Sequence, residues 1–146
     1  MVGVEPNAER AQAERSRGHS VRTGYYDESS AAELGRFDVI LFADVLEHMP
    51  HPGPVLRLAR QWLAPNGCVI ASIPNVAHRT IRLSLLGGQF TCTPFGLMDA
   101  THLRWFTVQS TRQLFVGAGF TRTELDCTSG AKLGCCNNFP LEVTRT

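Results

Sequence analysis

The stretch FDVILFADVLEH (37–48) decides the fold of this 146-residue chain. Its first part, Phe37–Ala43, is an apolar run of strand length, and such a run predicts a strand that is covered on both faces. The run ends in Asp44, and Glu47 and His48 follow within one turn. Ligands of open α/β sheets bind at the carboxyl ends of the strands. We therefore expect a binding site where this strand ends.

Segments with the character of strands and of helices alternate through the rest of the chain. We expect further strands over 2–5, 20–23, 68–73, 120–125 and 141–144, and helices over 8–17, 29–34, 54–63, 76–86 and 108–118. Strands separated by helices predict an α/β fold with a mostly parallel sheet and helices on both faces. No internal repeat or low-complexity linker divides the chain, so we expect a single domain over residues 1–146.

Composition and charge exclude several classes of protein. Apolar residues make up 43% of the chain and charged residues 18%, as in globular domains. Fourteen basic and thirteen acidic residues leave a net charge of +1, which disfavours nucleic acid as a partner. No apolar run approaches the roughly 20 residues of a membrane span, so we expect no membrane partner. The five cysteines show no C-x-x-C spacing, and the N-terminus does not resemble a signal peptide. Both observations indicate reduced thiols and a cytoplasmic protein.

Four landmarks, in order, resemble those of class I methyltransferases that depend on S-adenosylmethionine (SAM). The run Asp44–His48 resembles the region after the fourth strand of that fold. Leu63–Gly67 resembles the L-x-P-G-G turn before the fifth strand, and Ser72–Asn75 resembles the S-x-P-N that follows it. Leu97–Thr107 resembles the L-D-x-T-H-L-R-F-F-T block of small-molecule and sugar-type enzymes, some of them associated with glycosyltransferases. The resemblance covers nearly all of 2–126 and implies a Rossmann-like methyltransferase fold.

The resemblance implies SAM as the cofactor and indicates which residues bind it. Glu5 ends the segment similar to the second strand, where a carboxylate accepts hydrogen bonds from the ribose hydroxyls. Tyr26 and Asp27 lie near the position of an aspartate that binds adenine in relatives, and either a ring stacking on adenine or Asp27 could replace it. Ala43 and Asp44 would lie along the adenosine and methionine moieties. Each of these residues also has a purely structural interpretation. Glu5 could only stabilise the start of the following helix through the helix dipole, and the tyrosines could only be half-buried loop residues.

A second implied site involves acidic and histidine side chains. Ubiquinone-pathway O-methyltransferases and small-RNA 2′-O-methyltransferases carry a similar E/D-x-x-E-H run and a later histidine. By resemblance, Asp44, Glu47, His48 and His102 form a divalent-metal site beside the acceptor hydroxyl, with ligands suited to Mg, Mn, Fe or Zn. A metal-free role of His48 or His102 as general base is an equal alternative. The remaining alternative is that both histidines only pack in loops.

We expect a partial methyltransferase domain that begins at the second strand of the fold. In the family, the first strand, the glycine-rich loop and the first helix would precede Val2, so these 146 residues are expected to bind SAM poorly alone. The expected function is O-methylation of a small-molecule or sugar-like acceptor. One alternative is a non-catalytic interaction module whose incomplete sheet forms a homodimer or exchanges strands. Another is a metal-dependent RNA 2′-O-methyltransferase, which the neutral charge disfavours.

Overall fold

The computed structural model describes residues 1–125 and 138–144 and divides the chain into two compact units, Met1–Gly35 and Arg36–Thr146. The expectation of a single domain over residues 1–146 stays a prediction. Cys127, Cys135 and Cys136 lie outside the described residues. Among the helices in the described part of the chain, none is long and apolar enough to cross a membrane.

The first unit contains a parallel pair of strands with a helix between them. β1 (Gly3–Glu5) pairs with β2 (Val21–Thr23), and α1 (Ala8–Ser16) connects them. Asn7 begins α1 because its side-chain oxygen accepts a hydrogen bond from the main-chain N–H of Arg10 at 3.0 Å. Such a cap satisfies a donor that the helix itself leaves unpaired. This β-α-β order confirms the strand and helix predicted on either side of Asn7.

A second helix, α2 (Glu28–Leu34), follows β2 in the first unit. It begins at Asp27, whose carboxylate accepts from the N–H of Ser30 while the Ser30 hydroxyl accepts from the N–H of Asp27. This reciprocal pair is a capping box. The helix ends at Gly35, whose φ of 78° is rare for other residues.

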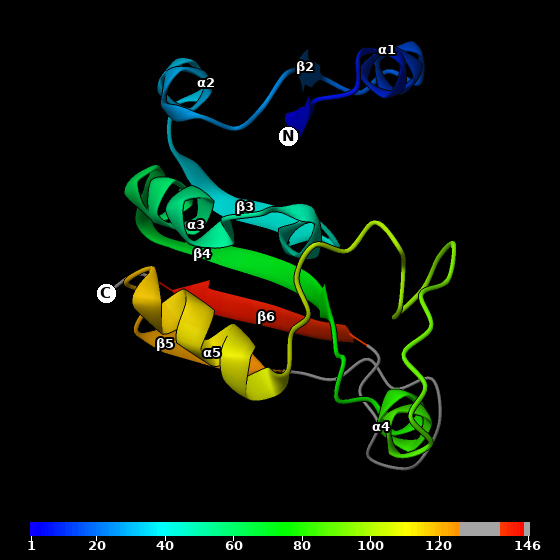
Figure 1. Cartoon of the computed structure of the whole chain (residues 1–146). Coiled ribbons are helices and arrows are strands. Elements are labelled where there is room, and N and C mark those ends of the chain that lie inside the picture. The colour runs from blue at the N-terminus through cyan, green and yellow to red at the C-terminus, as the bar shows by residue number, and fades with distance from the viewer. Residues whose placement is uncertain (126–137, 145–146) are drawn as a thin grey trace. The chain divides into compact units, whose positions relative to one another are not determined.

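The second unit contains a four-stranded sheet with the order β3-β4-β6-β5 (Figure 1). Its strands are β3 (Phe37–Ala43), β4 (Leu63–Pro74), β5 (Arg122–Leu125) and β6 (Asn138–Thr144). β3 and β4 are parallel, whereas β6 runs antiparallel to both β4 and β5. Within the described residues of this sheet, β6 is therefore the reversed strand, and the mostly parallel α/β fold predicted from the sequence is confirmed.

The core of the second unit lies between the sheet and two helices, α3 (Pro52–Gln61) and α5 (Val108–Gly117). α3 contacts both β4 and α5, and the two helices lie on the same side of the sheet in Figure 1. Fully buried side chains from these elements fill the space between them: Leu56, Ala59, Val69, Ala71, Ile73 and Phe115. Burying side chains of this size removes apolar surface from water and is the main stabilising contribution.

β3 differs from the expectation that it is covered on both faces. Phe42 is 6% exposed, but Val39 and Leu41 are 49% and 61% exposed. The expectation is wrong because α3 and α5 lie on the same side of the sheet, and the described elements of this unit leave the face with Val39 and Leu41 exposed. An apolar run therefore predicted the strand and its bounds, but not the cover on each face.

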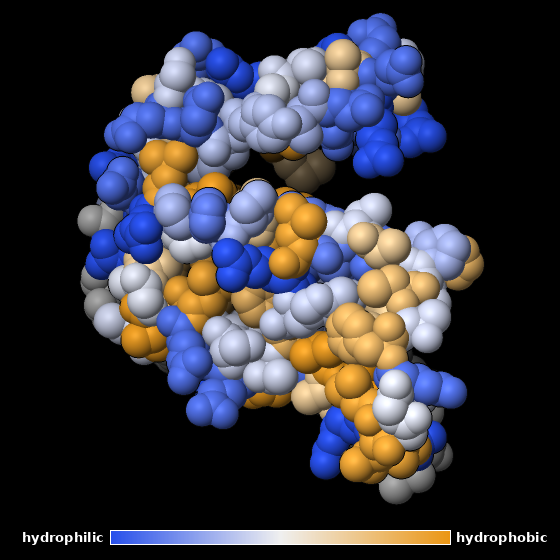
Figure 2. Space-filling model, viewed as in Figure 1, coloured by the Kyte–Doolittle hydropathy of each residue, from blue (hydrophilic) through white to orange (hydrophobic). Residues whose placement is uncertain are grey.

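α4 (Arg79–Leu86) starts three residues later than predicted. The chain before it forms an isolated parallel β-bridge between Asn75 and Phe106, and the N–H of Val76 donates to the carbonyl of Phe106 at 2.8 Å. The side chains of Leu83, Leu85 and Leu86 are exposed, and Figure 2 shows apolar surface over this helix. α4 therefore contributes little to the core beyond Ile81, which is 6% exposed.

β4 begins at Leu63 rather than at the predicted Cys68, and the turn around Gly67 lies within it. The register between β3 and β4 shifts at this point, as at a β-bulge. A Cβ atom on Gly67 would lie 3.0 Å from the carbonyl oxygens of Phe37, Asp38 and Ala64. Only glycine lets the two main chains approach so closely.

We expect Gly67→Ala to lower the free energy of unfolding by about 1–3 kcal/mol, because the added methyl group must push main-chain atoms apart. Urea denaturation of the purified chain measures this change. Gly117→Ala is the matched control, because a Cβ atom there meets nothing within 4 Å. Equal losses in both variants would show that the close approach at Gly67 does not matter.

Candidate functional site

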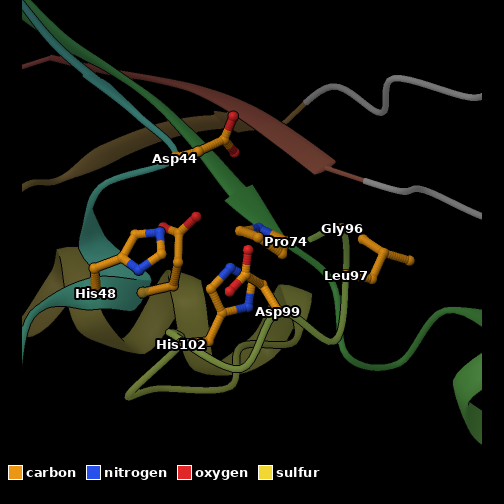
Figure 3. Close-up of a pocket in the computed structure, with 8 residues that line it drawn as sticks. Asp44, His48, Pro74, Gly96, Leu97, Asp99 and His102 are labelled. Carbon is orange, nitrogen blue, oxygen red and sulfur yellow. The ribbon is translucent and has the colours of Figure 1, made fainter. Parts of the chain in front are cut away.

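A pocket of about 440 Å³ lies in the second unit at the carboxyl ends of β3 and β4. Three segments form it: the turn after β3, the end of β4 and the loop before α5 (Figure 3). The residues that line it are Asp44, Glu47, His48, Pro74, Gly96, Leu97, Asp99 and His102. The pocket is therefore at the sheet edge predicted from the sequence, and Asp44, Glu47, His48 and His102 all line it.

The turn after β3 is set by Asp44, whose φ of 50° is uncommon for a residue with a side chain. Its N–H donates to the carbonyl of Ser72 on β4 at 3.1 Å, and its Oδ1 accepts from the Ser72 hydroxyl at 2.9 Å. The chain then enters the short helical turn η1 (Leu46–His48), which the fully buried Leu46 anchors in the core. These contacts bring Glu47 and His48 to the pocket.

The loop before α5 docks on η1 through main-chain hydrogen bonds. The carbonyl of Glu47 accepts from the N–H groups of Leu103 and Arg104 at 2.9 and 3.0 Å. The Arg104 side chain also donates from Nε to the carbonyl of Pro50 at 2.9 Å. The imidazole of His102 is thereby held beside that of His48, with ring centroids 4.9 Å apart.

Glu47, His48 and His102 form a compact group of possible ligands. Each offers one ligand atom, and these atoms lie within 4.8 Å of one another. Glu47 is 1% exposed, and neither of its carboxylate oxygens has a hydrogen-bond partner in the described part of the chain. The carboxylate of Asp44 lines the same pocket but is not one of this group. The structure thus brings together three of the four predicted metal ligands.

Burial changes the protonation of this group. Removal from water raises the pKa of Glu47 to about 6, and the nearby charge of Asp44 adds to the increase. Burial, with the charge of His48 as the next cause, lowers the pKa of His102. Near neutral pH the pocket therefore holds a poorly solvated carboxylate beside a neutral imidazole. Carboxylate oxygens and imidazole nitrogens together suit a divalent cation, and a neutral imidazole can also accept a proton.

The predicted cofactor residues are divided between the two units. In the first unit, Glu5 ends β1, and its Oε1 accepts from the N–H of Asn7 at 2.8 Å. Burial raises the pKa of the half-buried Tyr26, whose hydroxyl has no hydrogen-bond partner among the described residues. The N–H and hydroxyl of Ser30 lower the pKa of Asp27, which caps α2. In the second unit, Ala43 and Asp44 are exposed at the end of β3.

Sequence reasoning did not assign roles to Asp99 and Thr101, although both lie in the block 97–107. Asp99 Oδ1 accepts from the N–H and the hydroxyl of Thr101, and Thr101 contacts Nδ1 of His48. The signal that could have found them is the D-x-T spacing directly before His102, because an acidic side chain often bonds the main chain two residues later.

Comparison with known proteins identifies the family. A family model described as "Methyltransferase domain" matches residues 1–125. The chain belongs to the methyltransferase domain family. The ubiquinone biosynthesis O-methyltransferase of Azorhizobium caulinodans is 33% identical over 135 residues, which cover 86% of this chain and 51% of that protein. The enzyme of the same name from Psychrobacter arcticus is 24% identical over 96 residues, covering 66% and 37%.

Solved structures share the fold of this chain. A SAM-dependent methyltransferase from Archaeoglobus fulgidus has a TM-score of 0.71 at 13% identity, and the match covers 99% of this chain and 75% of that one. Magnesium protoporphyrin IX methyltransferase from Synechocystis, solved with bound SAH, has a TM-score of 0.64 at 16% identity, covering 99% and 64%. At these identities the likeness shows the fold alone. The methyltransferase domain described here spans about half the length of the Azorhizobium relative.

Proposed function

We propose that this chain takes part in SAM-dependent methyl transfer to an oxygen atom of a small-molecule or sugar-like acceptor bound in the pocket after β3 and β4. One observation carries the proposal: a fully buried carboxylate, Glu47, has no hydrogen-bond partner among the described residues and faces two imidazoles. A buried charge without a partner is costly, and such groups are retained mainly where they act. The names of the O-methyltransferase relatives support oxygen as the acceptor atom.

SAM, when bound, supplies a methyl group on a sulfonium centre. Glu5, Tyr26 and Asp27 are proposed to hold its ribose and adenine, and Ala43 and Asp44 to lie along the rest of it. Asp44 is exposed and its main chain is in the left-handed conformation, with a φ of 50°. Residues with a side chain in this conformation are typical of ligand sites. In this proposal the protein contributes mainly by holding the acceptor oxygen in line with the methyl group.

Glu47, His48 and His102 are proposed to activate the acceptor hydroxyl. Their oxygen and nitrogen donors fit a divalent cation, and the unpartnered carboxylate of Glu47 is the group that such an ion would satisfy. A divalent cation, when bound, would lower the pKa of the acceptor hydroxyl. Asp44 is the fourth proposed ligand and lines the same pocket.

A second proposal for the same residues is metal-free general-base catalysis. The lowered pKa of His102 keeps its imidazole neutral near pH 7, so that it can take the proton of the hydroxyl. Chelation distinguishes the metal proposal from the general-base proposal. If methyl transfer survives removal of divalent ions but falls in His48→Ala or His102→Ala, the general-base proposal is correct.

The exposed edge strand β3 favours a different class of function, an interaction module. An uncovered edge can pair with another strand, in a homodimer or by strand exchange. A dimer that forms without any binding of SAM would support it. RNA methylation remains a third candidate, and RNA binding with a steep dependence on salt would support it.

We expect Glu5→Ala to weaken SAM binding by about 1–3 kcal/mol, because the ribose would lose a charged hydrogen-bond acceptor. Binding of SAM to the purified wild type and variant is measured by calorimetry. Glu9→Ala is the control, because Glu9 lies in the first turn of α1 without a proposed contact. Equal affinities of wild type and Glu5→Ala would reject the assignment.

Mn²⁺ binding to the 146-residue chain tests the metal proposal without requiring SAM. We expect the electron paramagnetic resonance signal of free Mn²⁺ to fall on addition of the chain, and Mg²⁺ to compete. Glu47→Gln should abolish the binding, because it replaces the charged ligand by a neutral amide. Binding that is unchanged in Glu47→Gln would place the ion elsewhere.

A further inference from the structure

The loop that carries His102 also contacts the ring of His48 through a short chain of hydrogen bonds. Asp99 Oδ1 accepts from the hydroxyl of Thr101 at 2.6 Å and from its N–H at 2.8 Å. The Thr101 hydroxyl oxygen lies 3.3 Å from Nδ1 of His48, and the Thr101 carbonyl oxygen lies 3.2 Å from the same atom. Residues that are 53 positions apart in the chain thus meet at one ring nitrogen.

The charge of Asp99 determines where the Thr101 hydroxyl hydrogen points. An aspartate carboxyl with its ordinary pKa of about 4 is ionised at neutral pH, and the two hydrogen bonds that Asp99 accepts from Thr101 favour that form. An ionised carboxylate can only accept hydrogen bonds. The hydroxyl hydrogen must therefore point at Asp99, and the Thr101 hydroxyl can offer only a lone pair to His48.

Two acceptors then face Nδ1 of His48, since a main-chain carbonyl has no hydrogen to donate either. A lone pair on Nδ1 would meet two further lone pairs, whereas an N–H at Nδ1 can bond both oxygens. A neutral imidazole carries one N–H, and the hydrogen bond at one nitrogen fixes the state of the other. Nε2 must then carry the free lone pair.

We propose that Asp99 and Thr101 are positioning residues that hold His48 in the tautomer with hydrogen on Nδ1 and a free lone pair on Nε2. The consequence for catalysis rests on the proposed function, because both the metal ligand and the general base need that lone pair. Partners of this kind orient ligating histidines in many metal sites. With the other tautomer, Nε2 would present a hydrogen to the pocket and could neither bind a cation nor accept a proton.

The surrounding structure makes this proposal testable by substitution. The loop is attached to η1 by the main-chain bonds from Leu103 and Arg104 to Glu47, which do not depend on the side chains of Asp99 or Thr101. His102 provides a control ring in the same pocket, because its buried Nδ1 has no hydrogen-bond partner among the described residues. Asp99 acts on the His102 ring only through its charge and not through a ring hydrogen bond, so we expect the tautomer of His102 to change less than that of His48.

The test is long-range ¹H–¹⁵N correlation of the histidine rings in the 146-residue chain, without metal, SAM or acceptor, at a pH at which the rings are neutral. His48→Gln identifies the His48 signals by their loss. In the wild type we expect a protonated Nδ1 and an unprotonated Nε2 at His48. In Asp99→Ala the Thr101 hydroxyl is free to donate to Nδ1, and we expect a mixture of the two tautomers.

Thr101→Val gives the opposite expectation, because the carbonyl of residue 101 remains as the acceptor and the Nδ1–H form persists. Asp38→Ala removes an exposed carboxylate from β3 and should change nothing at His48. Amide spectra that agree with wild type outside residues 96–104 would show that the variants are folded. A wild-type His48 with hydrogen on Nε2, or an Asp99→Ala spectrum identical to wild type, would overturn the proposal.

Mn²⁺ affinity is the second readout and separates this proposal from the proposed function. If the chain binds Mn²⁺, we expect Asp99→Ala to weaken the binding about 10- to 100-fold, the usual effect of losing a partner of a ligating histidine. If the wild type binds no Mn²⁺, the metal proposal fails, while the tautomer measured in the metal-free chain still decides the role of Asp99 and Thr101.

Discussion

His102→Ala is expected to reduce methyl transfer by about 10²- to 10⁴-fold, the range over which a positioned acid or base contributes to a rate. The imidazole of His102 lies against that of His48, and its possible ligand atom is within 4.8 Å of a carboxylate oxygen of the buried Glu47. Its removal takes away either a metal ligand or the general base. His102 is not one of the residues proposed to bind SAM, so SAM affinity should stay unchanged.

The experiment compares the methyl-transfer rates of the wild type, His102→Ala and His51→Ala, with SAM and with phenolic and sugar hydroxyl acceptors. His51 is an exposed histidine next to α3 without a side-chain capping bond, so its loss should leave the rate unchanged. A SAM affinity and a melting temperature equal to those of the wild type would show that His102→Ala is folded and binds the cofactor, so that the lower rate reflects a loss of catalysis. A His102→Ala chain that transfers methyl groups as fast as wild type would exclude both proposals for this residue.

The sequence predicted the strands better than the surfaces that cover them. The bounds of β3 agree with the predicted Phe37–Ala43, because an apolar run between polar residues is a local signal. The start of α4 was wrong by three residues because Val76 bonds to Phe106, a partner thirty residues later. Contacts of that kind depend on the tertiary fold and have no signature in a local pattern.

The candidate site could be predicted in outline for the same reason. The end of an apolar strand and the order of the family landmarks placed Asp44, Glu47 and His48 at one sheet edge. His102 joins them only because Leu103 and Arg104 bond to the carbonyl of Glu47, and a sequence does not show main-chain docking. The separation of Asp44 from the other three follows from its left-handed turn and its bond to Ser72.

Glu47 is expected to make the stability of the chain fall as pH rises. Its pKa is raised from 4.5 to about 6 in the folded state, because burial disfavours the charged carboxylate. The folded state therefore binds the proton more tightly than the unfolded state. The resulting stabilisation is fully present below pH 4.5 and is lost as pH rises through about 6. At roughly 1.4 kcal/mol per pKa unit, the loss amounts to about 2 kcal/mol.

Urea denaturation in a chelator at several pH values between about 4 and 7.5 measures the free energy of unfolding of the wild type and of Glu47→Gln. Subtracting the two profiles removes the titration of all other groups, and the difference should change by about 2 kcal/mol across this window. A flat difference would show that Glu47 has an ordinary pKa and is not desolvated.

Divalent metal should reverse this effect, since a cation binds the ionised carboxylate and stabilises the folded state in proportion to its affinity. With Mg²⁺ in place of the chelator, we expect the wild type to regain at pH 7.5 the stability that it lost, while Glu47→Gln gains nothing. The buried charge of Glu47 would then destabilise the metal-free protein, and the bound ion would restore that stability. If Mg²⁺ leaves the wild-type profile unchanged although Glu47 titrates near pH 6, the pocket is a desolvated acid-base site, and catalysis would depend on His102 and His48 alone.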